Sequence, residues 1–147
     1  MIPLRRATLG DAAAIADLHR LATFTAMPFL PDLHSAQDRR RFFGATVLAE
    51  QEVWVAVLEG RLAGFVAHKP GWVDHLAVHP DFQGRGVGRA LMARAMEPGQ
   101  PLQLWTFQRN ARARRFYERL GFAPVRLTDG SGNEEREPDV LSAWPAP

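Results

Sequence analysis

The sequence predicts a single mixed α/β domain, an α+β sheet that is antiparallel at its flanks and parallel at one step in the middle. In residues 72–107 a strand, a glycine-rich loop, a helix and another strand follow one another, and a crossover of this kind joins parallel strands. On either side of this section, short apolar runs separated by turns are typical of antiparallel strand pairs. A length of 147 residues fits one domain over residues 1–147, with room for a substantial core.

The N-terminal third should hold one strand and two helices. Residues 2–7 read as a strand, and residues 10–22 as a helix, because apolar side chains recur there at helical spacing on one face. Pro28 interrupts the helical pattern. A second helix is expected over residues 35–48, where Ser35 suits the start of a helix and an acidic residue three positions later suits the helix dipole.

The middle of the chain alternates strands with one helix. Residues 53–59 and 61–69 flank a Glu-Gly turn, which is typical of a hairpin, and residues 72–80 form a third strand. Residues 83–96 combine a glycine-rich loop with a helix that a Pro-Gly pair ends, and residues 101–107 form the next strand.

The C-terminal part should complete the sheet. Residues 110–122 are expected to hold a helix, with Gly121 as its C-terminal cap. Residues 122–127 and 137–144 read as two last strands, joined by a loop rich in glycine and small polar residues. The expected order is strand, two helices, three strands, helix, strand, helix and two strands, with helices covering the faces of the sheet.

The composition excludes several classes of function. There is no cysteine, so the chain has no disulfide, thiolate metal site or cysteine nucleophile, and its histidines lack metal-ligand spacing, so no metal is expected. No apolar run is long enough to span a membrane, and charges run through the first twenty residues, unlike a signal peptide. A cytoplasmic location is expected. The net charge of +2 is small for a nucleic-acid-binding domain, although 17 of the 18 basic residues are arginine.

A glycine-rich loop opens the expected helix of residues 83–96. Its glycines permit close approach of a ligand to the backbone, and the free N–H groups at a helix start favour an anion. A nucleotide-binding P-loop is excluded because no lysine follows the glycines, and the dinucleotide motif fails because Arg89 stands at its third glycine position. The loop consists of Gln83, Gly84, Arg85, Gly86, Val87 and Gly88.

Two motifs in order and at family spacing resemble those of the GNAT family of N-acetyltransferases, most clearly over residues 72–123. The first places Gln83, Gly86 and Gly88 after a strand. The second comprises Asn110, Ala113, Phe116, Tyr117, Glu118, Gly121 and Phe122. The resemblance implies the acyl-CoA N-acyltransferase fold and direct transfer of an acetyl group from acetyl-CoA to a primary amine in a ternary complex, without a metal. A cysteine-bound acyl intermediate is excluded because there is no cysteine.

The resemblance also implies roles for particular residues. The pyrophosphate of coenzyme A would lie on the loop from Gln83 to Arg89, with Arg85 adding positive charge. The pantetheine arm would enter a gap between splayed strands 72–79 and 101–107, and pair with the backbone of Leu76, Ala77 and Val78. Asn110 would contact the cofactor near the thioester, although asparagine is also a good helix N-cap, and Ala113 would also belong to the cofactor site. Tyr117 would protonate the departing thiolate.

The general base is less evident. The positions at which some relatives carry a glutamate hold Trp72 and Trp105 in this sequence. Asp74 is the first candidate, on the same sheet face as Trp72, and His75 is the second, on the opposite face. A relayed water, or an amine of low pKa, would need neither. His79 should shape the loop before Pro80, while the remaining histidines, His19, His34 and His68, read as non-catalytic.

The acceptor would enter between the two N-terminal helices and the loop 127–139. Four phenylalanines either line an apolar pocket or simply belong to the core: Phe24, Phe29, Phe42 and Phe43. The acidic residues of the loop either attract a cationic amine or form a solvated surface: Glu134, Glu135, Glu137 and Asp139.

Two other functions stay open. The missing glutamates favour a non-catalytic acyl-CoA-binding or sensing domain on the same fold. The helix 109–119 carries Arg112, Arg115 and Arg119 along one face, which favours a basic nucleic-acid-binding module, although a solvated face explains it as well. The identity of the acceptor is open, as is a homodimer.

Overall fold

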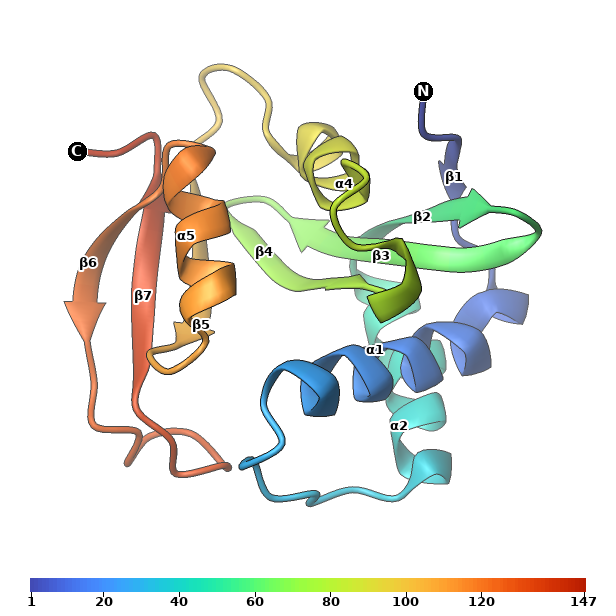
Figure 1. The fold of residues 1–147 in the computed structure, drawn as a ribbon, viewed down its shortest axis with the longest axis horizontal. Helices are drawn as coiled ribbons and strands as arrows, with labels where there is room; N and C mark the ends of the chain where they lie inside the picture. The colour runs from blue at the N-terminus through green and yellow to red at the C-terminus, as the bar shows by residue number, and fades with distance from the viewer.

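The computed structural model describes residues 1–147 and contains one seven-stranded sheet with the strand order β1-β2-β3-β4-β5-β7-β6 (Figure 1). Only β4 and β5 run parallel, while every other neighbouring pair is antiparallel, so the predicted mixed sheet is confirmed. The strands are β1 (Leu4–Arg6), β2 (Glu52–Leu58), β3 (Arg61–Lys69), β4 (Trp72–Val78), β5 (Leu102–Phe107), β6 (Ala123–Leu127) and β7 (Asp139–Trp144).

Helices cover both faces of this sheet. In Figure 1, α1 and α2 lie on one side of β2, β3 and β4, α4 lies on the other side, and α5 lies along β5 and β7. The α-helices are α1 (Ala12–Ala26), α2 (Ala36–Phe42), α3 (Leu48–Glu50), α4 (Val87–Ala95) and α5 (Ala111–Arg119). The shorter turns are the 3₁₀ segments η1 (Leu9–Asp11) and η3 (Pro80–Phe82) and the π-helical segment η2 (Phe43–Val47).

The first helix is longer than the sequence pattern predicts. It runs four residues beyond position 22, because the backbone can still close helical hydrogen bonds up to Met27, whose N–H donates to the carbonyl of Thr23 at 2.8 Å. Pro28 follows at once and has no N–H to continue the ladder. The helix therefore carries Thr23 and Phe24 into the neighbourhood of the functional site.

The second helical segment begins as expected but is not a uniform α-helix. The hydroxyl of Ser35 accepts a hydrogen bond from the N–H of Asp38 at 3.0 Å, which confirms the predicted cap. The helix then widens into a π-helical turn from Phe43 to Val47, and both of these side chains are fully buried. A Cβ on Gly44 would lie 3.4 Å from the Cβ of Ala12, so this turn packs closely against α1.

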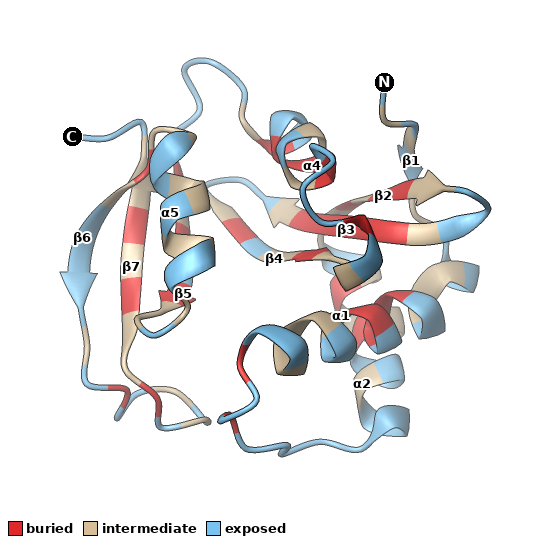
Figure 2. Ribbon diagram, viewed as in Figure 1, coloured by how far each residue is buried: buried red, intermediate tan, exposed pale blue.

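Two apolar cores lie on opposite faces of the sheet. Ile15 and Phe43 pack with Phe65 on the α1 side, whereas Leu91 and Phe82 pack with other apolar residues on the α4 side. β3 runs between the two cores and reads as a continuous buried stretch, as expected of a strand covered on both faces (Figure 2). This core is the rigid base from which the site is built.

The sheet opens at its single parallel step. β4 and β5 share one residue pair, Trp72 with Gln103, next to a hydrogen bond of 2.8 Å from the N–H of Gln103 to the carbonyl of Gly71. The strands diverge beyond that point, which confirms the expected splay, and the edge of β4 is left without a strand partner. β7 continues the sheet on the far side of β5.

Candidate active site

A cavity of about 1130 Å³ opens where β4 and β5 diverge. Its walls come from α1 and the segment that joins it to α2, from the splayed parts of β4 and β5, from α5, and from the loop between β6 and β7. Six residues predicted for the site line it: Asp74, His75, Leu76, Asn110, Ala113 and Tyr117. The fold therefore brings residues of β4 and of α5 with its N-cap, which are distant in the sequence, to one space.

The edge of β4 offers a place for an extended ligand. Leu76 lines the cavity, and its neighbours Ala77 and Val78 point their side chains into opposite cores. The prediction requires only the backbone groups of these three residues, which would pair with the pantetheine arm. This stretch of β4 pairs with β3 on one side and has no strand on the other. Unpaired N–H and C=O groups at a strand edge can accept a further extended chain.

The glycine-rich loop lies outside the cavity lining and leads into α4. As the sequence predicts, a loop precedes the helix, which begins at Val87 after Gly84 and Gly86 adopt left-handed backbone angles with φ of 78° and 84°. A Cβ at either glycine would meet nothing within 4 Å, so both face open space. The first N–H groups of α4 have no partner inside the helix and are therefore available to an anion.

Arg85, Val87 and Gly88 of the loop have structural contacts within the protein. Arg85 lies over the ring of Phe82 and 3.8 Å from the carboxylate of Glu59, while Gln83 and Arg89 are exposed. Val87 is buried, so it can offer only its backbone N–H. A Cβ on Gly88 would come within 3.1 Å of the Phe116 ring, and this glycine therefore lets α4 pack against α5.

Asn110 has the structural role that its residue type favours. Its side-chain oxygen accepts a hydrogen bond from the N–H of Ala113 at 3.3 Å and caps α5. The same side chain lines the cavity, and its amide NH₂ group donates no hydrogen bond within the protein. Capping thus leaves one polar end of Asn110 free to meet a ligand.

Tyr117 lies on the cavity side of α5. Its ring packs edge-on against Phe116 and Phe122, with centroids 5.3 and 5.7 Å away, and its hydroxyl has no hydrogen-bond partner in the protein. Burial raises the pKa of the phenol above its ordinary value of 10. The hydroxyl therefore keeps its proton at neutral pH.

Asp74 differs from the sequence-based expectation. Its carboxylate accepts a hydrogen bond from Gln51 at 2.8 Å and lies 3.2 Å from the ammonium of Lys69. The register between β3 and β4 shifts at this point, and such a bulge disturbs the regular alternation of side chains. Asp74 and His75 both line the cavity, although regular alternation would place them on opposite faces of the sheet.

His75 is an uncharged, half-buried group at the cavity wall. Its ring lies 5.1 Å from that of Phe43 and 5.3 Å from that of His19, which also lines the cavity. Burial lowers the pKa of His75 to about 4, and Lys69 contributes in the same direction against an opposing effect of Asp74. Burial, with His75 second, lowers the pKa of His19 to about 3. Both imidazoles are therefore uncharged at neutral pH.

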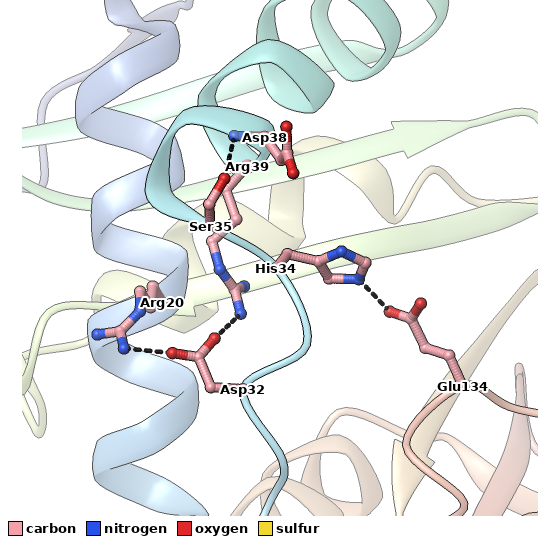
Figure 3. Close-up of polar contacts among 7 residues, drawn as sticks. All are labelled: Arg20, Asp32, His34, Ser35, Asp38, Arg39 and Glu134. Carbon is pink, nitrogen blue, oxygen red and sulfur yellow. Dashed lines mark hydrogen bonds and ion pairs between the residues drawn. The ribbon is translucent and has the colours of Figure 1, made fainter.

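Two loops meet over the open end of the cavity. The ring of His34 lies 2.9 Å from the carboxylate of Glu134, which joins the α1–α2 connection to the β6–β7 loop (Figure 3). On the first of these loops, Asp32 is held between Arg20 and Arg39, and the Asp38 N–H bonds to Ser35 in the same view. His34, predicted to be non-catalytic, thus has a bridging role.

Arg109 anchors the β6–β7 loop, a role that the sequence did not reveal. Its guanidinium donates two hydrogen bonds, of 2.8 and 2.7 Å, to the buried carboxylate of Glu137, and it lies 3.5 Å from the centre of the Phe29 ring. Glu137 was expected to begin the last strand. It instead closes the loop, and β7 begins at Asp139 after Pro138, which has no N–H to donate. The only sign of this ion pair in the sequence was the opposite charge of Arg109 and Glu137, which lie 28 positions apart.

Three of the four phenylalanines line the cavity. Phe24, Phe42 and Phe43 line the cavity, Phe43 from within the core, whereas Phe29 is covered by Arg109. Thr106, also missed from the sequence, is a buried cavity-lining residue whose hydroxyl has no partner. His79 accepts a hydrogen bond from the Asp81 N–H at 3.0 Å, which confirms its loop-shaping role.

Other predicted features have simple structural counterparts. Arg112, Arg115 and Arg119 are exposed on α5 and make no ion pairs, as a solvated face would. His68 lies 3.3 Å from Glu52, away from the cavity. No three metal-ligating side chains come together, and no helix has the length and apolar character needed to cross a membrane.

Comparison with known proteins places this geometry in a family. Residues 49–124 match the family model described as an acetyltransferase (GNAT) domain. The chain is 28% identical to the peptidyl-lysine N-acetyltransferase YiaC of Escherichia coli over 97% of its own length and 96% of that protein. It is 32% identical to the uncharacterized N-acetyltransferase MJ1207 of Methanocaldococcus jannaschii over 55% of its length, and spans 43% of that relative.

A solved structure shows the same fold over nearly the whole chain. The structure of yncA from Salmonella typhimurium with its cofactor acetyl-CoA superposes with a TM-score of 0.75, at 21% identity, over 98% of this chain and 93% of that one. Together with the match of residues 49–124, the splayed sheet and the glycine-rich loop have one consistent explanation. The chain belongs to the GNAT family of acetyltransferases.

Proposed function

We propose that this protein transfers an acetyl group directly from acetyl-CoA to a primary amine while both are bound. The observation that carries the proposal is the divergence of β4 and β5 after one residue pair, which opens a cavity beside Tyr117. The acetyl-CoA bound to yncA and the printed activity of YiaC support the donor and the amine acceptor. In this arrangement the pantetheine arm lies along Leu76 to Val78, and the pyrophosphate meets the N–H groups at the start of α4.

The reaction needs two proton transfers. As the amine nitrogen attacks the thioester carbonyl, a C–N bond forms, the C–S bond breaks, and the sulfur leaves as a thiolate. Tyr117 gives its proton to that thiolate. The proton lost by the amine goes to His75, which is uncharged at neutral pH, or to a water molecule beside it. His75 is favoured over Asp74 because the latter is already engaged by Lys69 and Gln51.

Isothermal titration with acetyl-CoA and with coenzyme A tests this proposal. We expect the wild type to bind both and the Gly86→Glu variant to bind neither, because the variant places a negative side chain where the pyrophosphate lies and strains a backbone with positive φ. Gly99→Glu is the matched control. Gly99 also has a positive φ, of 81°, and nothing near its Cβ, but it lies in the turn between α4 and β5.

The second candidate function is acyl-CoA binding without catalysis. It is favoured by the tryptophans at positions 72 and 105, where a glutamate base is absent. Release of thiol from acetyl-CoA on addition of amines decides between the two. Tight binding of acetyl-CoA without thiol release from any amine would favour the binding domain, and failure of the wild type to bind would reject both. A cytoplasmic location and a homodimer remain predictions.

A further inference from the structure

Five acidic side chains line the cavity, and four of them already have a partner within the chain. Asp74 is paired with Lys69 at 3.2 Å, Asp38 with Arg41 at 3.4 Å, Glu134 with His34 at 2.9 Å, and Asp139 with Asn133 at 3.1 Å. The fifth, Glu135, forms no ion pair with any cation of the protein. Asp139 likewise has no cation beside it, but its carboxylate accepts hydrogen bonds from Asn133 and Thr128, so Glu135 is the one carboxylate of the cavity that lacks any side-chain partner.

The surroundings of Glu135 make this charge unfavourable without a ligand. The residue is partly buried, and burial, followed by the neighbouring Glu134, raises the pKa of its carboxyl. A carboxylate that is partly removed from water is stabilised by a cation placed beside it. The group thus has the properties of a binding residue for a positive ligand.

The loop that carries Glu135 is fixed at both sides of it. The Asn133 side chain donates to the Glu137 carbonyl at 2.8 Å and accepts from the Glu137 N–H at 3.2 Å. The Glu137 carboxylate is in turn held by Arg109. Because the chain is anchored two residues before and two residues after Glu135, a ligand meets a pre-positioned carboxylate.

Apolar side chains line the same cavity from three other segments. Leu33, Phe42 and Trp105 line it and yet remain 47%, 46% and 42% exposed. Exposed apolar surface within a concave site favours a ligand with an apolar part. Arg126 also lines the cavity and lies over the Trp105 ring, but it is exposed to water and so has less need of a counter-ion.

We propose that Glu135 binds the acceptor, and that the acceptor is a primary ammonium group at the end of an apolar stem, as in a lysine side chain, without a free α-carboxylate. The inference rests on the function proposed above for this cavity and adds to it the chemical class of the acceptor. Glu135 acts here as a specificity-determining residue, since its charge matches the acceptor and the apolar wall matches the stem.

Binding can be measured separately from transfer. Two probes are compared by NMR titration in the presence of coenzyme A, which has no acetyl group to give: Nα-acetyl-L-lysine amide and Nα-acetyl-L-norleucine amide, which has the same stem without the ammonium. We expect the wild type to bind the lysine probe roughly tenfold more tightly, as one hydrogen bond to a charged group provides. Glu135→Gln should lose this margin. Glu97→Gln, which changes the same charge on an exposed residue outside the cavity, should keep it.

The contrary outcomes are distinct. The proposal is overturned if the wild type binds the two probes equally, or if Glu135→Gln keeps the preference for the lysine probe. It is also overturned if the protein binds free L-leucine preferentially and Arg126→Gln removes that preference. Thiol release with acetyl-CoA and the lysine probe is then measured on the same proteins. A preserved binding margin without any thiol release rejects the transferase function but leaves the assignment of Glu135 standing.

Discussion

The hydroxyl of Tyr117 lines the cavity without a hydrogen-bond partner, although its ring is packed between Phe116 and Phe122. Such packing fixes the direction of the C–O bond and leaves the hydroxyl free to donate to a ligand. The raised pKa of the phenol means that the proton is present throughout the physiological range. A thiolate that develops beside it removes this proton more readily than water does, because a thiol has a pKa near 8.5 and its anion is poorly solvated in the cavity.

Replacement of Tyr117 by phenylalanine tests this role. The variant keeps the ring and its packing, so it should fold and bind acetyl-CoA with unchanged affinity. Its kcat should fall by about 10²-fold or more, as expected when a general acid is lost. Steady-state kinetics and calorimetry on the same preparation separate these two quantities. Unchanged turnover would assign the proton transfer to another group.

His75 and His19 form a second feature at the scale of single residues. The two rings face each other edge-on at 5.3 Å between α1 and β4, and both have pKa values well below the ordinary 6.5 because they are buried. In the unfolded chain these imidazoles take up protons near pH 6.5, whereas in the folded chain they do so only at about 3 to 4. Between these limits the unfolded state binds more protons, so stability falls as the pH falls.

The pH dependence of unfolding should show this pair directly. We expect the free energy of unfolding of the wild type to decrease between pH 6.5 and pH 4 and to be insensitive to these residues above pH 7. His75→Phe should flatten the decrease, because the phenylalanine ring fits beside Phe42 and Phe43 and takes up no proton. Urea unfolding at several pH values gives both slopes. If the free energy of unfolding of the wild type and of His75→Phe changes equally with pH, His75 is protonated to the same extent in the folded and unfolded states.

At the scale of elements, the β6–β7 loop shows how a segment without regular structure is made rigid. A Cβ placed on Gly130 would lie 2.4 Å from the carbonyl carbon of Glu137, and its φ of 84° is unfavourable for other residues. The N–H of Gly130 donates to Thr128, whose hydroxyl also bonds to Asp139. The two ends of the loop therefore touch through backbone, and glycine is required at that contact.

Two glycines of this loop form a matched test. Gly130→Ala should destabilise the protein by about 1–3 kcal/mol, because the new methyl group forces the loop away from Glu137. Gly132→Ala should have almost no effect, since its Cβ would meet nothing within 4 Å and its φ is not positive. Thermal unfolding of both variants checks the difference. Equal losses in the two would show that the loop relaxes freely around position 130.

The elements also show which parts of the structure were accessible from sequence. The strand ranges followed from local patterns, because alternating apolar residues and turn signals act within a few positions, whereas the splay was expected only from the resemblance to the GNAT family. The π-helical turn at Phe43–Val47 did not, since it depends on the contact between Gly44 and Ala12 of another helix. The bulge at Asp74 and the Arg109–Glu137 pair were missed for the same reason. Each arises from contacts between distant segments, which the spacing of one sequence does not record.

At the scale of the whole molecule, the splay divides the sheet into two parts that share little backbone pairing. β1 to β4 lie between α1 and α4, while β5, β7 and β6 carry α5 (Figure 1). Beyond the one residue pair of β4 and β5, the parts share the core on the α4 side, where Leu104 belongs to the same buried cluster as Leu91. They also meet through Gly88 against Phe116 and through His34 with Glu134 at the cavity mouth. A ligand in the gap contacts both parts and therefore adds to the interactions that hold them together.

Acetyl-CoA should thus stabilise both parts at once. At a concentration one hundred times its Kd, a ligand that binds only the folded state adds about 2.7 kcal/mol, which corresponds to a rise in Tm of about 5–10 °C for a domain of this size. Hydrogen exchange should slow at the β4 edge from Leu76 to Val78 and, in the other part, around Tyr117 in α5. Gly86→Glu should show neither effect. Protection confined to residues 83–89 would mean that the cofactor rests on the glycine-rich loop without entering the gap, and that the cavity serves a different ligand.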